Sequence, residues 1–283
     1  MGGFHSDHQR HQPDPDAPPC VARASKVAGP RLGDCARSTP TPTRSGTAAA
    51  PGSRATRIRS GPRRPDRSIR KRHHVVVANE WKKSEHVDHY LALVDTVPHR
   101  AEGESVLLEQ VPLAARRILD LGTGDGRLLD LVRADRPTSV AVAVDVSEPM
   151  LERARERFAD QPVELLHHDL AEPLPDLGRF DSVVSSLAIH HLEDERKRSL
   201  YAEIFAGLKP GGVFANFEHV ASPTARLHRR FYEAIGEPLE WEDPSDRLVD
   251  VETQLRWLRE VGFEDVDCYW KWLEVALLVG VKP

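Results

Sequence analysis

The residues with the most evident chemical potential are an acid and three alternate glycines in the segment RILDLGTGDGR. An apolar run leads into Asp120, and Gly122, Gly124 and Gly126 follow before an apolar, helix-like segment begins. Strand, tight turn and helix in this order form the setting in which glycines let the backbone come close to a nucleotide. A dinucleotide-binding loop has the spacing G-x-G-x-x-G, whereas here Arg127 occupies the place of the third glycine. The loop is therefore predicted to hold a nucleotide without needing to cradle a pyrophosphate.

A second acid, Asp145, ends the next apolar run, about 20 residues beyond the glycines, which is the usual offset of a ribose-binding acid. A carboxylate at that position accepts hydrogen bonds from both ribose hydroxyls. The alternative role is support for the start of the following helix. With the glycine loop present, we favour the ribose.

Two groups of histidines follow later strands. His167, His168 and Asp169 are adjacent, and neighbouring residues on a strand point to opposite faces, so they do not chelate one ion easily. No other group has zinc-type spacing, and we expect no metal site.

His190 and His191 lie after the fourth expected strand, and one of them is a candidate general base or acceptor-orienting group, because imidazole changes charge near neutral pH. The alternative is that one merely caps the next helix. Glu218, just past the fifth strand, is a further candidate on the acceptor side.

The elements that must position these residues alternate between apolar runs and amphipathic segments. We expect strands at 118–121, 140–145, 163–167, 180–185, 213–217, 265–270 and 275–281, and helices at 85–94, 101–111, 127–133, 148–158, 194–208, 224–234 and 251–261. The last two strands are separated by too few residues for a helix and should pair antiparallel. This pattern predicts an α/β fold with a Rossmann-like doubly wound sheet, mostly parallel with an antiparallel last strand, whose ligand lies at the carboxyl ends of the strands.

Charge divides the chain of 283 residues into two parts. Residues 1–74 carry 15 Lys and Arg against 5 Asp and Glu, whereas residues 75–283 carry 24 against 39. The first part is rich in Pro, Arg, Ser, Ala and Gly without apolar periodicity, and we expect a disordered basic tail. The second part is about one domain's worth of chain. No apolar run reaches the roughly 20 residues that span a bilayer, and the 3 cysteines have no metal-ligand spacing, which favours a reducing cytoplasm.

Together, the glycine loop, the D-x-S-x-x-M-L pattern that begins at Asp145 and the LKPGG turn resemble class I S-adenosylmethionine-dependent methyltransferases over about residues 110–220. The resemblance implies that fold, S-adenosylmethionine as cofactor and methyl transfer to a small-molecule acceptor. It assigns Asp169 to the adenine amino group and Leu170 to the adenine ring. The cofactor-binding residues that it implies are Asp120, Gly122, Thr123, Gly124, Gly126, Asp145, Val146, Met150, Asp169, Leu170 and Ser186.

The acceptor side is expected in two stretches, the N-terminal lid helices of residues 75–112 and an insertion at residues 219–250. Tyr90 and Arg100 are substrate candidates in the first stretch, and Arg100 would recognise a carboxylate or else be a solvated surface residue.

Three alternatives to methyl transfer remain, of which one is a cofactor-binding protein without catalysis, because methyl transfer needs no signature base. The segments VPHR, VETQLRWLREVGF and LLVGVK resemble the layout of carboxy-S-adenosylmethionine synthase, although the key arginine of that family has no counterpart at matching spacing. The third alternative is an RNA modifier that uses the basic tail, which the net charge of −15 on residues 75–283 opposes, since phosphate backbones demand a basic face. We therefore expect neither nucleic acid nor membrane as a partner, and make no prediction of oligomeric state.

Overall fold

A computed structural model describes residues 87, 91, 94, 97–239 and 242–283. Within these residues one seven-stranded sheet has the order β3-β2-β1-β4-β5-β7-β6. Its strands are β1 (Arg117–Leu121), β2 (Val140–Asp145), β3 (Val163–His167), β4 (Phe180–Ser186), β5 (Leu208–His219), β6 (Glu264–Trp272) and β7 (Val275–Val281). The first five pair in parallel, and β7 runs antiparallel to both β5 and β6. The predicted mostly parallel sheet with an antiparallel last strand is confirmed.

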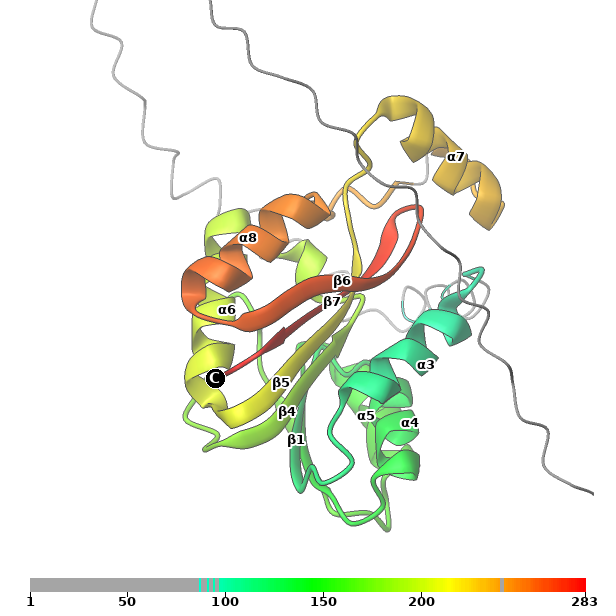
Figure 1. The fold of residues 1–283 in the computed structure, drawn as a ribbon. Coiled ribbons are helices and arrows are strands. Elements are labelled where there is room, and N and C mark those ends of the chain that lie inside the picture. Colours follow the sequence, from blue (N-terminus) through cyan, green and yellow to red (C-terminus); the bar gives the residue numbers. More distant parts are fainter. Residues whose placement is uncertain (1–86, 88–90, 92–93, 95–96, 240–241) are drawn as a thin grey trace, which may run out of the picture. The chain divides into compact units, whose positions relative to one another are not determined.

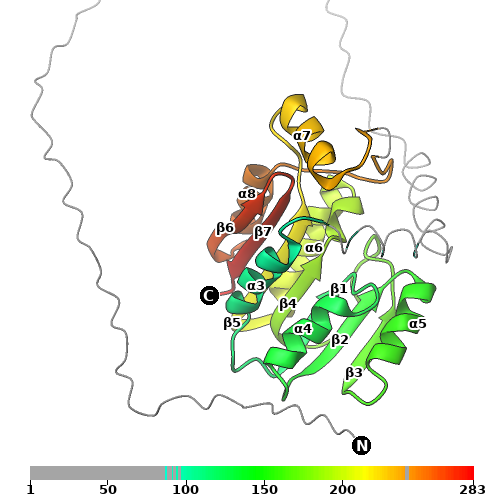
Figure 2. The same cartoon turned by 90° about the vertical axis from the view of Figure 1, so that its right-hand side faces the viewer.

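Helices cover both faces of this sheet, as Figures 1 and 2 show. They are α3 (Arg100–Gln110), α4 (Arg127–Asp135), α5 (Glu148–Arg157), the short 3-10 helix η1 (Ile189–His191), α6 (Asp194–Gly207), α7 (Ala225–Ile235) and α8 (Val251–Val261). Alternate residues of β1 separate the core into two parts: Leu119 packs in the cluster that includes α6 and α8, and Ile118 in the one that includes α3, α4 and α5. The strand order reverses between β1 and β4, so the carboxyl ends of these two strands mark the place where such sheets bind ligands.

Side-chain caps fix the starts of α5 and α8. Ser147 Oγ accepts a hydrogen bond from the Met150 amide at 3.4 Å, and Pro149 lies in the first turn of α5. Asp250 Oδ1 accepts from the Thr253 amide at 2.9 Å at the start of α8. Because these signals are local in sequence, the predicted starts of both helices agree with the structure.

The segment LKPGG differs from its prediction as a turn before the fifth strand. β5 already begins at Leu208, because Gly211 donates its amide to the Lys282 carbonyl at 2.8 Å and the Lys282 amide donates to Gly212 at 2.9 Å. Gly211 has a φ of 75°, and the register between β4 and β5 shifts in this region. The glycines thus form an irregularity inside an extended strand rather than ending it.

Part of the expected N-terminal region lies outside the described residues. Of the helix expected at 85–94, the structure describes Val87, Leu91 and Val94, each of them helical. Tyr90 and the expected tail at residues 1–74 are not among the described residues. No helix within the described part of the chain is long and apolar enough to cross a membrane.

Candidate functional site

The glycine loop connects β1 to α4, and all three of its glycines have positive φ. The values are 69° at Gly122, 57° at Gly124 and 86° at Gly126, a conformation that favours glycine. Gly122 is also tightly packed, since a Cβ there would lie 2.1 Å from the Cβ of Ala188, in the segment after β4. The alternate spacing of glycines thus serves both the backbone turn and close packing against the neighbouring strand end.

Asp145 ties this loop to the end of β2. One carboxylate oxygen accepts a hydrogen bond from the Gly124 amide at 2.8 Å, and the other accepts from the Ser147 amide at 2.8 Å. Burial raises the pKa of Asp145, and these backbone donors oppose that rise without cancelling it. The carboxylate therefore supports both the loop and the start of α5 before any ligand contributes.

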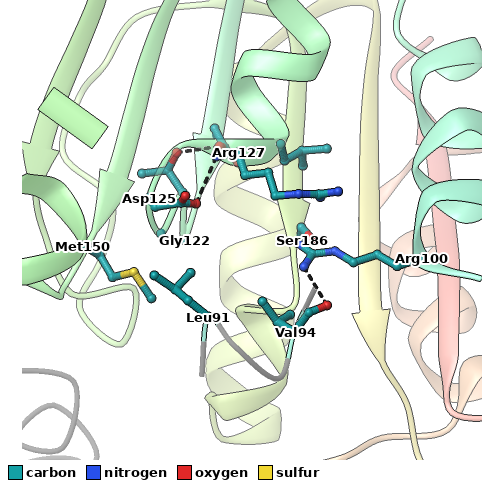
Figure 3. A pocket seen from close by; sticks show the side chains of 12 residues that line it. Leu91, Val94, Arg100, Gly122, Asp125, Arg127, Met150 and Ser186 are labelled. Atoms are coloured by element: carbon teal, nitrogen blue, oxygen red, sulfur yellow. Dashed lines mark hydrogen bonds between the residues drawn. The ribbon is translucent and has the colours of Figure 1, made fainter. Parts of the chain in front are cut away.

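A pocket lies beside the loop, as Figure 3 shows. Its lining residues are Leu91, Val94, Arg100, Asp120, Gly122, Thr123, Gly124, Asp125, Arg127, Leu128, Met150 and Ser186. Six residues implied by the resemblance share this one cavity, namely Asp120, Gly122, Thr123, Gly124, Met150 and Ser186. They come from the ends of β1 and β4, the glycine loop and α5, which is the convergence that a doubly wound sheet predicts.

Two oxygens in this pocket are buried without a hydrogen-bond partner among the described residues, Asp120 Oδ1 and Ser186 Oγ. The other oxygen of Asp120 accepts from Thr123 Oγ1 at 2.7 Å. Burial raises the pKa of Asp120 to about 7, with a further contribution from the Asp145 and Asp125 carboxylates. Buried polar atoms without a partner are destabilising. The pocket thus has unmet capacity for a ligand that carries hydrogen-bond donors or positive charge.

Arg100 lies in this pocket and is not a solvated surface residue, being only 8% exposed. It donates to Glu104 Oε1 at 2.8 Å and to the Val94 carbonyl at 2.9 Å, the bond drawn in Figure 3. Glu104 also forms an ion pair with Arg127. These contacts connect α3 to Val94 on one side of the pocket and to the start of α4 on the other.

The remaining cofactor candidates lie outside the pocket lining. Gly126 is the N-cap of α4. Asp169 accepts from the Ala171 amide at 2.9 Å, Leu170 is buried in the core, and the Val146 carbonyl is 2.9 Å from His167 Nε2. Leu170 nevertheless approaches the loop, since its Cδ1 lies 3.9 Å from the position of a Cβ on Gly122. Their roles toward the adenine remain predictions.

His190 lies in η1, just beyond the end of β4, and Glu218 lies behind it. Its Nδ1 is 2.7 Å from Glu218 Oε1. Glu218 is fully buried and also accepts from Asn216 Nδ2 at 3.1 Å and the His219 amide at 2.9 Å. Burial raises the pKa of Glu218, but the charge and hydrogen bond of His190 outweigh it, and the pKa is lowered overall. Glu218, a candidate on the acceptor side, is fully buried and contacts His190, and its role stays a prediction.

Asp246 joins this group from the irregular segment before α8, and no sequence pattern points to it. Its Oδ1 is 3.6 Å from His190 Nε2 and 3.4 Å from His191 Nδ1, and its Oδ2 is 3.4 Å from His219 Nδ1. The imidazoles outweigh the effect of burial and lower the pKa of Asp246 to about 2. Burial and the neighbouring His190 lower the pKa of His191 to about 3. A single acid about 55 residues from the histidines has no spacing pattern by which to recognise it.

Lys197 holds the Asp246 segment in place. Its side chain is fully buried in α6 and donates to the Leu192 carbonyl at 2.6 Å and to the Arg247 carbonyl. Burial lowers the pKa of Lys197, and the nearby carboxylate of Glu218 counteracts this in part. Asp246 is thus placed beside the histidines by the contact of Lys197 with a segment about 50 residues away.

Comparison with known proteins agrees with this geometry. A methyltransferase domain matches residues 118–212, which contain the loop, the pocket acids and His190. An uncharacterized methyltransferase of Mycobacterium tuberculosis is 40% identical over 113 residues, which cover 40% of this chain and 55% of that protein. The chain thus matches only about half the length of this relative.

Two further similarities extend over more of the chain. The carboxy-S-adenosyl-L-methionine synthase of Desulforapulum autotrophicum is 30% identical over 186 residues, which cover 59% of this chain and 74% of that protein. The structure of human N-acetylserotonin methyltransferase in complex with S-adenosylmethionine shares the fold, with a TM-score of 0.54 at 17% identity, covering 71% of this chain and 57% of that one. Sheet order, glycine loop and relatives agree, and the chain belongs to the class I S-adenosylmethionine-dependent methyltransferase family.

Proposed function

We propose that the chain binds S-adenosylmethionine in the pocket beside the glycine loop and transfers its methyl group to a small-molecule acceptor. The observation that carries the proposal is the pair of buried oxygens without partners, Asp120 Oδ1 and Ser186 Oγ, in one cavity with the loop glycines. The cofactor supplies an electrophilic methyl group on a sulfonium centre. Burial raises the pKa of Asp120 because the carboxylate has lost its solvating water. A cationic ligand would stabilise the charged form in place of that water.

The proposed binding residues have different roles that follow from their place in the fold. Asp145 is not in the pocket lining but reaches it through its hydrogen bond with the Gly124 amide. Asp120 and Ser186, at the ends of neighbouring strands β1 and β4, would hold the charged methionine part. Asp145, at the end of β2, would hold the ribose, with Met150 toward the adenine. The positive φ angles of the loop favour glycine. Because glycine has no side chain, the backbone itself can approach the ligand at these positions.

On the acceptor side, His190 is the proposed general base. Its Nδ1 faces the carboxylate of Glu218, which only accepts hydrogen bonds, so the proton of a neutral imidazole resides on Nδ1. Nε2 is then the atom that takes a proton from an acceptor hydroxyl or amine. The segment of His190 is packed against the loop through the approach of Ala188 to Gly122, which couples base and cofactor pocket. The chemistry itself mainly requires the two reactants to be aligned and dry.

Asp145→Ala should weaken the affinity for S-adenosylmethionine by about 2 kcal/mol or more, the scale for losing a charged hydrogen-bond partner. The loss has two sources, the ribose contact and the support of the Gly124 amide. Titration calorimetry of the full chain measures it, with the exposed acid variant Asp160→Ala as control. Equal affinity of Asp145→Ala and the unaltered chain would contradict the assignment.

A second candidate function is the synthesis of carboxy-S-adenosylmethionine. The observation that favours it is the relative from Desulforapulum autotrophicum, of whose length the chain covers 74%. In this case the pocket would hold a cofactor with an added carboxyl group. The buried guanidinium of Arg100, which lines the cavity together with Arg127, would be the cation that faces this carboxylate. The mass of the bound nucleotide distinguishes the two functions.

A further inference from the structure

The three side chains of His190, His191 and Asp246 lie at distances that are unusual for a hydrogen-bonded cluster. Asp246 Oδ1 is 3.6 Å from His190 Nε2 and 3.4 Å from His191 Nδ1, beyond the usual range of N–H···O hydrogen bonds. His191 Nδ1 is also 2.9 Å from Ser245 Oγ, a hydroxyl that would have to turn away for this nitrogen to bind an ion. The three ligand atoms all lie within 4.8 Å of one another. Ligands about 2.0–2.1 Å from a tetrahedral zinc ion are roughly 3.4 Å apart, which is close to both distances.

The orientation of His190 is also the one found in metal sites. A histidine ligand usually donates its other ring N–H to a carboxylate, which fixes the tautomer and the ring plane. Here Glu218, fully buried, lies 2.7 Å from Nδ1. This leaves Nε2, directed at Asp246, with the lone pair that a metal requires.

The burial of these side chains and the types of their ligand atoms indicate which class of ion the cluster would bind. His190 is 6% exposed and Glu218 is fully buried, and the side chain of Asp246 is 8% exposed. Carboxylates this deeply buried are found paired with cations or bound to metal ions. Two imidazoles and one carboxylate suit zinc and related transition metals, whereas magnesium and calcium prefer oxygen ligands.

We propose that His190 Nε2, His191 Nδ1 and Asp246 Oδ1 form a binding site for a divalent transition-metal ion, with zinc as its reference ion. Three protein ligands leave a coordination position open, as in catalytic rather than structural sites. The proposal departs from the sequence expectation of no metal site, because adjacent histidines and a distant acid have none of the spacings used to recognise one. None of the three ligands lines the glycine-loop pocket, so the site stands whether or not that pocket binds S-adenosylmethionine. An ion on His190 Nε2 would occupy the lone pair that the general-base role requires, so in the metal-bound protein a bound ion would favour loss of the acceptor proton in place of that base.

The test uses the full chain without a histidine tag, stripped of metal with a chelator and titrated with zinc in competition with a chromophoric chelator. The unaltered chain should bind one more ion than His191→Gln and Asp246→Asn. Glu218→Gln keeps all three ligands and should weaken binding by about 10- to 100-fold, the usual effect of losing such a support. His228→Gln is the matched control, because this histidine contacts Glu274 and is not a ligand. It should bind zinc like the unaltered chain.

Cobalt supplies a second measurement, because its visible absorption reports the coordination geometry of the bound ion. The cobalt-loaded unaltered chain should show the intense visible absorption of a four-coordinate ion, and His191→Gln should lose it. Thermal unfolding of each metal-free variant identifies any that fails to fold. In that case the comparison rests on His191→Gln, because His191 is partly exposed. The proposal is overturned if the two ligand variants bind zinc with the same stoichiometry and affinity as the unaltered chain, or if cobalt gives no such absorption. Equal binding would place the ion on other histidines of the chain, such as His5, His8 and His11.

Discussion

Replacing Gly122 with alanine is expected to destabilise the protein by about 2–5 kcal/mol and to lower its affinity for S-adenosylmethionine. A left-handed backbone costs a residue with a Cβ about 1–2 kcal/mol, and overpacking adds about 1–3 kcal/mol. Both costs apply, since φ is 69° and the new Cβ would lie 2.1 Å from that of Ala188. Relief of the overlap moves the segment that leads to His190. Denaturant unfolding gives the stability, and calorimetry gives the affinity.

Gly124→Ala is the matched control for this variant. Its φ is 57°, but the nearest atom to a Cβ there is Met150 Sδ at 3.9 Å, so the backbone cost remains without the overlap. The double variant with Ala188→Gly should recover the packing part of the loss at Gly122. If Gly122→Ala and Gly124→Ala lose equal stability and Ala188→Gly rescues neither, the packing of the loop against this strand end is not as described.

Asp120→Asn is expected to stabilise the cofactor-free protein at neutral pH while weakening its affinity for S-adenosylmethionine. The pKa of Asp120 in the folded state is about 7 against 3.8 for an unperturbed group. Between these values the native state keeps a proton that the unfolded state has released, so stability falls as pH rises. At about 1.4 kcal/mol per pH unit, the loss reaches about 4 kcal/mol near pH 7. Asparagine carries no charge and avoids this loss.

The measurement is urea unfolding of both proteins between pH 4 and pH 8, without cofactor. The difference in stability should grow with pH in favour of Asp120→Asn and level off above about pH 7. In parallel, the unaltered chain should bind the cationic cofactor more weakly as pH falls below about 7, and the variant should bind weakly throughout. Parallel stability curves for the two proteins would show that the Asp120 carboxyl does not titrate as its burial implies.

How far the sequence determines the structure depends on whether the information is local. The bounds of β2, β3, α8 and β7 match their predictions. β2 and β7 are nearly unbroken apolar runs, and α8 is an amphipathic segment with a side-chain cap. The sequence predicts a turn at LKPGG, whereas the contacts that make this segment part of β5 are with Lys282 at the far end of the chain.

The same distinction applies to the site. The spacing of three alternate glycines and of the acid at the end of β2 is visible in the sequence. It predicts the loop that these residues form in the structure. The role of Glu218 as support for His190 and the arrival of Asp246 beside it depend on packing between β5, η1 and the segment before α8. Arg100 contacts Glu104 and Val94 nearby in the chain, but Glu104 is held by an ion pair with Arg127 of another helix, and no local pattern predicts that this arginine is buried.

Cofactor binding is tested most directly by the mass of whatever nucleotide is released when the purified full chain is denatured. The proposed function predicts S-adenosylmethionine or its demethylated product. A species heavier by one carboxyl group would instead support the carboxy-S-adenosylmethionine synthase function. A dinucleotide such as NAD would contradict the assignment of the pocket, because it requires room for a pyrophosphate where this loop has Arg127 in place of a third glycine.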